Sequence, residues 1–251
     1  MSLFDLDWPI LTIIVVAFIG GGVLKGVAGA GLPMILVSTL ASFVSPAMAI
    51  AVSSVPLFSS NVVQVWQGRN QWPQIARFWP MLLPIFLFTI LGAQILIAVD
   101  PKAIALVLGI IVSGFTAIRF FVRHWRVSPS SVRFLGPVIG SVSGILGGVS
   151  SFHGPPLMMY FAALGLKKDL FVPLLCTCFV AGGLPLYASL VWHGELTWHV
   201  LLLSALAAVP VQVGLEIGRR LRGRISEAAF ANFVTLILVG IGLNLIRRGL
   251  S

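Results

Sequence analysis

The chain has 251 residues, of which 58% are hydrophobic and only 9% are charged, and its mean hydropathy is +1.05. This composition excludes a soluble globular domain and predicts a polytopic membrane protein, because a helix needs about 20 apolar residues to cross the bilayer core. The net charge of +9 predicts basic loops that face anionic lipid at the cytoplasmic surface, and it does not indicate binding to nucleic acid.

Apolar runs, taken in chain order, predict an all-α fold. The first half of the chain has runs at about 9–28, 33–44, 47–66, 76–99 and 102–122. The second half has runs at about 134–152, 155–166, 170–192, 197–218 and 226–246. A polar loop is expected at 67–73, and a basic stretch with a Ser/Pro-rich linker occupies 123–133 between the halves. The sequence therefore divides into a first transmembrane repeat, 1–126, and a second, 127–251.

Residue identities indicate that the two halves arose by duplication. Six residues are each followed by the same residue type 126 positions later, namely Trp66, Gly68, Trp72, Pro84, Gly92 and Gly114. A constant offset on the rarer residues Trp and Pro is the signature of an internal repeat. Because each half holds an odd number of segments, the second half must enter the membrane from the opposite side. We therefore expect two inverted repeats of five segments.

The distribution of basic residues predicts the topology. If both termini lie outside, 12 of the 16 Lys and Arg residues fall in or beside inner loops. Inner loops of membrane proteins carry this excess of basic residues.

Two Gly/Pro-rich stretches interrupt the apolar runs, at 26–33 and at 144–156. A backbone that leaves the helix within lipid exposes its N–H and C=O groups, which protein or cavity water must then satisfy. A pair of such breaks, one in each half and near the membrane middle, predicts a transporter's binding site. The alternative is that these glycines serve only close helix packing.

We interpret the two breaks as an anion-binding site. Helix N-termini carry partial positive charge, and Pro33 and Pro155 suit a first helical turn. The candidate substrate-binding residues come from the two breaks and from a polar face of 47–66 that could line an anion pathway. They are Lys25, Gly29, Gly31, Pro33, Ser53, Asn61, Gln64, Ser150, Ser151, His153, Gly154 and Pro155. Lys25 could instead extend to the cytoplasmic interface. The polar residues of 47–66 could instead form interhelical hydrogen bonds.

Three stretches make the chain resemble the TauE/SafE family over nearly its full length: Gly26 to Pro33, Trp66-Gln67-Gly68, and Gly144 to Gly148. The resemblance implies a small-anion transporter of the bacterial inner membrane that exports sulfite or an organosulfonate, and it allows a homodimer.

We expect export by alternating access, with no cofactor, no metal and no catalytic residue. No phosphate-binding loop of the Gly-x4-Gly-Lys-Ser/Thr type is present, so gradients are expected to drive transport. The alternative is a proton-coupled importer of a small sulfur-containing or carboxylate anion. An intramembrane enzyme is disfavoured, because His153 beside Ser150 and Ser151 is its one hint and a third partner is missing.

Overall fold

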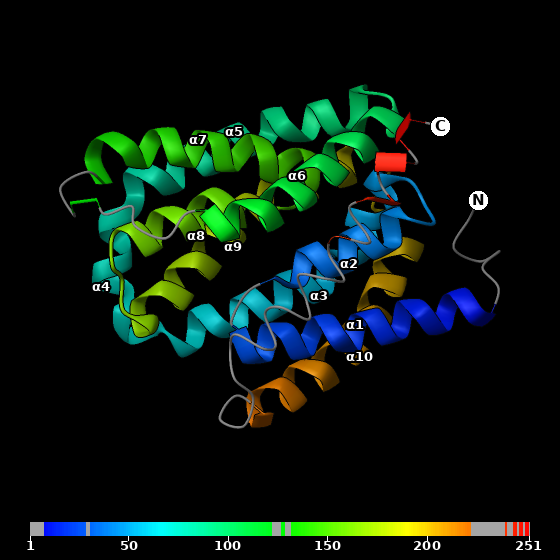
Figure 1. Ribbon diagram of the computed structural model, residues 1–251, viewed down its shortest axis with the longest axis horizontal. Helices are drawn as coiled ribbons and strands as arrows, with labels where there is room; N and C mark the ends of the chain where they lie inside the picture. Colours follow the sequence, from blue (N-terminus) through cyan, green and yellow to red (C-terminus); the bar gives the residue numbers. More distant parts are fainter. Residues whose placement is uncertain are drawn as a thin grey trace. The chain divides into compact units, whose positions relative to one another are not determined.

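The computed structural model describes residues 8–28, 31–121, 127–128, 132–221, 239, 243–244, 246–247 and 249–250. Within these residues all regular elements are helical, which confirms the predicted all-α class (Figure 1). The helices are α1 (Trp8–Ala28), α2 (Leu32–Ala41), α3 (Pro46–Gln67), α4 (Trp72–Ile75), α5 (Trp79–Ala98), α6 (Pro101–Phe121), α7 (Val132–Ser150), α8 (Gly154–Ala163), α9 (Lys168–Trp192) and α10 (Trp198–Leu221). Most of the run expected at 226–246 lies outside the described residues.

The stretch 67–73, which we expected to be a loop, is partly helical. A 3-10 turn covers Arg69–Gln71, and α4 begins at Trp72. Pro73 lies in the first turn of α4, where its missing N–H has no intrahelical partner to lose. The polar composition of this stretch therefore marks a helical connection at the membrane surface.

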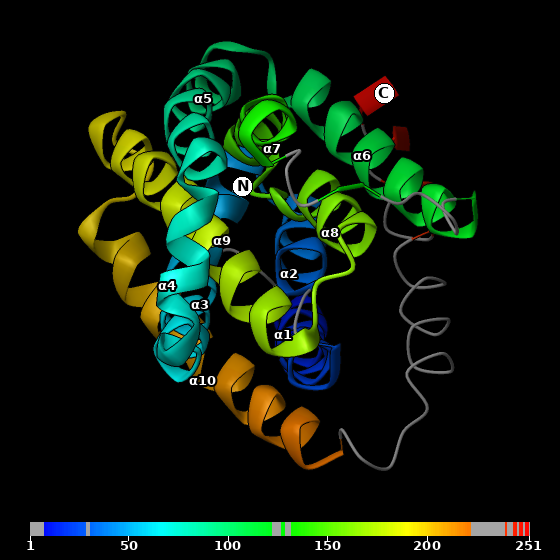
Figure 2. The same cartoon turned by 90° about the vertical axis from the view of Figure 1, so that its left-hand side faces the viewer.

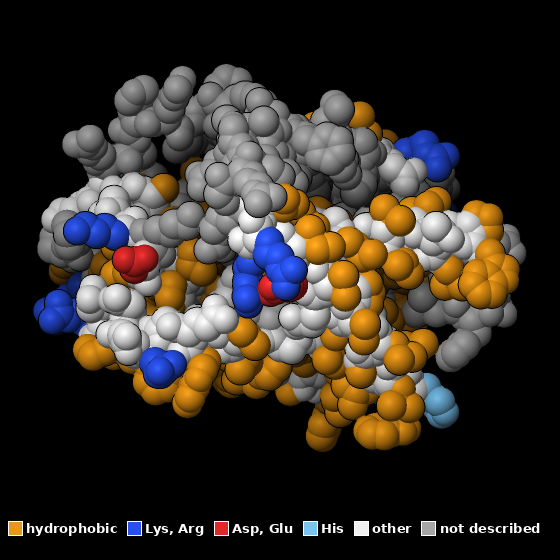
Figure 3. All heavy atoms as spheres, turned by 90° about the horizontal axis from the view of Figure 1, so that it is seen from below, with side chains coloured by type: hydrophobic (Ala, Val, Ile, Leu, Met, Phe, Trp, Pro, Cys, Tyr) orange, Lys and Arg blue, Asp and Glu red, His pale blue; other side chains and the backbone are white. Residues whose placement is uncertain are grey.

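Within the described residues, six helical segments are long and apolar enough to cross a membrane. α10 shows why lipid is the surrounding solvent. It exposes large apolar side chains, namely Leu202, Leu206, Val209, Val213 and Ile217, and it buries small ones, among them Ser204, Gly214 and Gly218. Lipid allows this pattern, because large apolar side chains can face the tails while small ones face neighbouring helices. On the face drawn in Figure 3, hydrophobic side chains likewise cover much of the described surface.

The chain forms two compact units. The first unit comprises Met1–Leu57, Val99–Ile118 and Glu195–Ser251, and the second comprises Phe58–Ala98 and Arg119–Gly194. One boundary falls inside α3, just after Pro56. Each unit contains helices from both halves of the sequence, whereas the division into repeats near residue 126 is a property of the sequence and stays a prediction.

In the first unit, α1 packs directly against α10 through glycine (Figures 1 and 2). A Cβ added at Gly26 would lie 2.7 Å from Gly218 Cα, and one added at Gly22 would lie 2.2 Å from the carbonyl oxygen of Val211. The two backbones therefore touch, and a side chain at either position would push the helices apart. Membrane helices commonly associate through small residues in this way, because the hydrophobic effect does not drive helix association within lipid.

In the second unit, α5 and α7 make the same kind of contact (Figures 1 and 2). A Cβ added at Gly148 would lie 2.7 Å from Gly92 Cα, and one added at Gly144 would lie 2.8 Å from the carbonyl oxygen of Ile85. α9 also packs on α5. Gly140, Gly144 and Gly148 thus serve helix packing on one face of α7, as the alternative interpretation of this stretch held.

Candidate functional site

The second break separates α7 from α8 over three residues. α7 ends at Ser150, and Ser151 follows with φ 63°, a left-handed conformation that is rare for a residue with a side chain. The Ser151 N–H donates to the Gly147 carbonyl at 2.6 Å, and the Phe152 N–H donates to Ser150 Oγ at 3.1 Å. These bonds satisfy backbone groups that the end of α7 would otherwise leave open. The predicted break is confirmed at this position.

His153 fills the space inside the second break. Its side chain is 3% exposed. A Cβ added at Gly147 of α7 would lie 2.0 Å from the imidazole Cδ2, and one added at Gly182 of α9 would lie 2.2 Å from Nε2. The ring therefore occupies space that exists only because both neighbouring helices have glycine there. Two glycines that are distant in sequence thus hold this histidine.

Hydroxyl groups surround His153. Thr89 Oγ1 of α5 lies 3.2 Å from His153 Nε2 and donates its own proton to the Ile85 carbonyl at 2.7 Å. Thr89 can therefore only accept from the imidazole, which places a proton on Nε2. The Ser143 hydroxyl donates to the His153 carbonyl, and Tyr187 of α9 lies near the Ser151 side chain. Helices α5 and α7 thus hydrogen-bond to His153, and α9 packs against its ring at Gly182.

The first break separates α1 from α2 in the first unit. α1 ends at Ala28, and Gly31 caps α2 with φ 94°, which glycine adopts without strain. A Cβ on Gly31 would also lie 2.7 Å from Leu24 Cδ2, so α2 folds back along α1. Pro33 lies in the first turn of α2, as predicted. Gly29 lies outside the described residues.

α2 and α8 are half-length helices. Each has ten residues and is about 15 Å long, roughly half the thickness of the hydrocarbon core. Neither has a side-chain cap at its N-terminus. The first residues of both, Leu32 and Gly154, are buried. Each break therefore presents the partly positive N-terminus of a helix inside the protein, which suits an oxyanion.

Gly154 and Pro155 open α8, and Pro155 lies in its first turn as predicted. A Cβ on Gly154 would meet only the Phe179 ring, at 3.3 Å, with the sulfur of Met158 farther away. Gly154 thus leaves more room than the packing glycines of α7. Ser150 differs from our expectation of a free donor, because its hydroxyl donates to the Leu146 carbonyl.

Lys25 is buried, with 2% of its side chain exposed. It lies in the last turn of α1, beside the Gly26 contact with α10. Burial of this kind favours a role inside the protein over extension to the cytoplasmic interface, because an amino group at membrane depth is costly unless it is functional or paired.

The polar residues of α3 divide between the units. Ser53 belongs to the first unit and donates to the Ala49 carbonyl at 2.8 Å, while Asn61 and Gln64 belong to the second. Asn61 is 5% exposed. Gln64 Oε1 accepts from the Cys176 thiol at 2.8 Å. Gln64 thus makes an interhelical hydrogen bond, as our alternative interpretation of this face described, whereas the bond of Ser53 lies within α3.

Sequence reasoning missed Thr89, Ser143 and Ser204. Thr89 is the only hydroxyl-bearing residue of α5, and this isolation in an apolar helix could have marked it. Ser204 Oγ of α10 accepts from the Val55 N–H at 2.9 Å, just before Pro56, and lies 3.3 Å from Ser54 Oγ. Nothing in the sequence indicates this pair, because its partners are 150 residues apart.

Helices that break within the membrane and begin again at a buried N-terminus are typical of secondary transporters. The chain is a membrane transporter. The family model described as "Sulfite exporter TauE/SafE" matches residues 13–245, and the chain belongs to that family. No curated protein and no solved structure gives a match.

Proposed function

We propose that this protein exports sulfite or a small organosulfonate anion across the bacterial inner membrane by alternating access. The observation that carries the proposal is the break between α7 and α8, where the N-terminus of a half-length helix is surrounded by Ser151, His153 and Tyr187. Backbone N–H groups and neutral side-chain donors can replace the hydration of a sulfur oxyanion. The matching family is described as sulfite exporters, which supports the substrate class.

Export of an anion needs no pump. In a cell that is negative inside, the free energy of an anion falls by about 2.3 kcal/mol per charge for each 100 mV when it leaves the cytoplasm. A facilitator with two alternately exposed states would suffice, and no ATP-binding loop occurs in this sequence. We also propose that both termini face outside, as the basic loops suggest.

We further infer that the fold is an inverted duplication. The supporting observation is a pair of equivalent contacts: Gly218 meets Gly26 between α10 and α1, and Gly92 meets Gly148 between α5 and α7. Gly92 and Gly218 are separated by the same 126 residues that relate the two halves of the sequence. In each unit, therefore, the first long helix of one repeat crosses the corresponding later helix of the other.

The second candidate is a proton-coupled importer of a small sulfur-containing or carboxylate anion. Import against the membrane potential requires a coupling ion, and a buried titratable side chain can carry a proton. His153 is such a side chain, in contact with Thr89 and buried in the second break.

Purified protein in proteoliposomes distinguishes the two candidates. Flux of labelled sulfite, sulfoacetate and taurine is measured with and without a pH gradient, at a set membrane potential. The export proposal expects flux that follows the potential alone. Flux that requires the pH gradient and disappears in His153→Gln would establish the importer. Absence of flux for all three anions would refute the sulfonate assignment.

The site is tested with Ser151→Gly. Glycine adopts φ 63° more easily than serine, so this variant removes the hydroxyl without destabilising the fold. We expect sulfite flux to fall about tenfold, the effect of losing one hydrogen bond to a charged group. The matched control is Ser141→Ala, which removes a hydroxyl that donates to the Pro137 carbonyl within α7 and should leave flux unchanged. Equal flux in both variants would exclude Ser151 from the site.

A further inference from the structure

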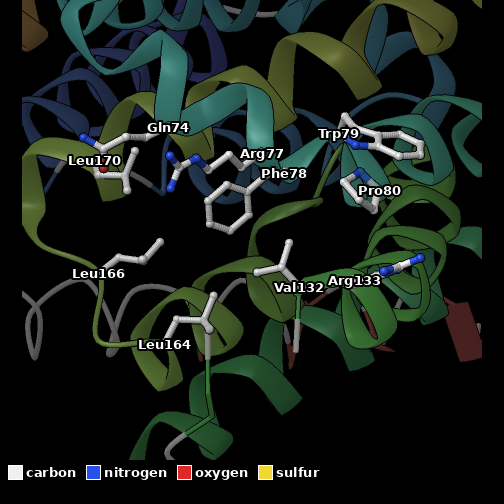
Figure 4. Close-up of a pocket in the computed structure, with 10 residues that line it drawn as sticks. All are labelled: Gln74, Arg77, Phe78, Trp79, Pro80, Val132, Arg133, Leu164, Leu166 and Leu170. Atoms are coloured by element: carbon white, nitrogen blue, oxygen red, sulfur yellow. The ribbon is translucent and has the colours of Figure 1, made fainter. Parts of the chain in front are cut away.

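The second unit contains a cavity of about 610 Å³ that lies apart from the helix breaks (Figure 4). It is formed where α4 leads into α5, where α7 begins, and where the connection from α8 leads into α9. In Figure 4, Arg77 and Phe78 face Leu164 and Leu166 across the hollow, and Arg133 lies on the side of Trp79 and Pro80. The lining residues therefore lie near the ends of helices and in the connections between them.

The cavity combines two cations with an apolar lining. Arg77 and Arg133 are both exposed, and no acidic residue lines the cavity. Among the residues that the structure describes, neither arginine has an ion-pair or hydrogen-bond partner. Arg219 and Arg220, by contrast, both pair with Glu216. The positive charge at this cavity is therefore available to a ligand.

The apolar lining of the cavity includes one buried aromatic side chain, Phe78, and one exposed aromatic side chain, Trp79. Phe78 is 7% exposed and packs edge-to-face on Phe161, with ring centroids 6.0 Å apart. Trp79, the first residue of α5, is 64% exposed. Exposed tryptophan at the end of a membrane-spanning helix is typical of the lipid headgroup level. The cavity thus lies where a polar headgroup meets hydrocarbon.

The predicted topology puts all three contributing chain segments on the cytoplasmic side, because each carries basic residues of the inner loops. The cytoplasmic leaflet contains the anionic phospholipids, and basic pockets between membrane helices on this side suit their headgroups. A free oxyanion such as sulfite or phosphate would need polar groups all round it, whereas most of this lining is hydrophobic side chain.

We propose that this cavity binds an anionic phospholipid, with its headgroup attracted by the positive charge of Arg77 and Arg133, which lie at opposite sides of the cavity (Figure 4), and an acyl chain lying against Trp79 and Leu166. Such a lipid bridges the start of α5, the start of α7 and the connection before α9. The site is separate from the helix breaks and does not depend on which anion the protein transports.

Native mass spectrometry of the full chain in detergent tests this proposal, with phosphatidylglycerol and phosphatidylcholine of identical acyl chains as probes. We expect phosphatidylglycerol to bind more tightly. Each arginine near the headgroups contributes about fivefold to the affinity, so Arg77→Gln with Arg133→Gln should weaken phosphatidylglycerol binding about twenty-five-fold. Binding of phosphatidylcholine, whose choline cation offsets the charge of its phosphate, should weaken much less. Both side chains are exposed, and an unchanged melting temperature without lipid checks that the variant folds.

The matched control is Arg69→Gln with Arg219→Gln, which removes the same charge from the same predicted side but not from the cavity. Arg69 lies over the Trp66 ring at 5.4 Å, and Arg219 pairs with Glu216. An equal loss of affinity in the control would indicate general charge attraction and refute the site. Equal affinity for the two lipids would also refute it. Displacement of phosphatidylglycerol by millimolar glycerol 3-phosphate or sulfite would identify a free-anion site instead of a lipid site.

Discussion

The substitution Gly182→Ala should destabilise the protein by displacing His153. A Cβ at this position would lie 2.2 Å from His153 Nε2, well inside van der Waals contact. The imidazole has little room to retreat toward α7, because it already fills the space beside Gly147, where an added Cβ would lie 2.0 Å from Cδ2. Overpacking of this kind costs about 1–3 kcal/mol. It should also break the contact with Thr89 and lower sulfite flux.

The matched control is Gly20→Ala in α1, where an added Cβ meets nothing within 4 Å. Helix propensity alone predicts that both substitutions stabilise the protein by about 0.5–1 kcal/mol. The structure predicts opposite signs, with only Gly20→Ala stabilising. Thermal unfolding in detergent measures the difference, at about 2–4 °C per kcal/mol for a chain of this size.

A double variant identifies the cause. Replacing His153 by alanine makes room for the new methyl group, so Gly182→Ala should cost much less in the His153→Ala background. The coupling between the two sites should reach about 1 kcal/mol or more, as for other residues in direct contact. If Gly182→Ala raises the melting temperature as Gly20→Ala does, or if the two changes at Gly182 and His153 are additive, the imidazole does not occupy this space and the proposed site geometry is wrong.

Three further predictions follow from the packing and the topology. Gly92→Ala would place a Cβ 2.4 Å from the carbonyl oxygen of Ile145. Because a backbone carbonyl cannot rotate away as a side chain can, we expect the free energy of unfolding to fall by about 3 kcal/mol or more. An unchanged melting temperature would contradict the α5–α7 contact. Cys178 is fully buried, so Cys178→Ala should retain sulfite flux, and the native thiol should react with maleimide only after the protein unfolds. Loss of flux in a folded variant would instead indicate that the thiol takes part in transport. A cysteine introduced at Arg69 should be labelled by an impermeant reagent only from inside and one at Lys102 only from outside, and labelling of both from one side would overturn the predicted topology.

For the glycines of α7, the sequence indicated either helix packing or a binding site, but it did not indicate which glycine has which role. Gly147 and Gly148 are neighbours, yet an added Cβ at the first meets His153 and one at the second meets the backbone of Thr89 and Gly92. Successive helical residues point about 100° apart, so they face different helices. Which glycine serves packing and which holds the histidine therefore depends on where α5 and α9 lie.

The sequence by itself determined the long apolar helices that the structure describes, the two breaks and the proline positions at the starts of α2 and α8. It could do so because backbone groups in lipid must be satisfied within their own segment, which makes apolar length and Gly/Pro content local signals. Only the tertiary structure decided that Thr89 meets His153, that Ser204 meets Val55, and that Gln64 accepts from Cys176. These partners come from separate helices, and the side chains that meet are set by how those helices cross.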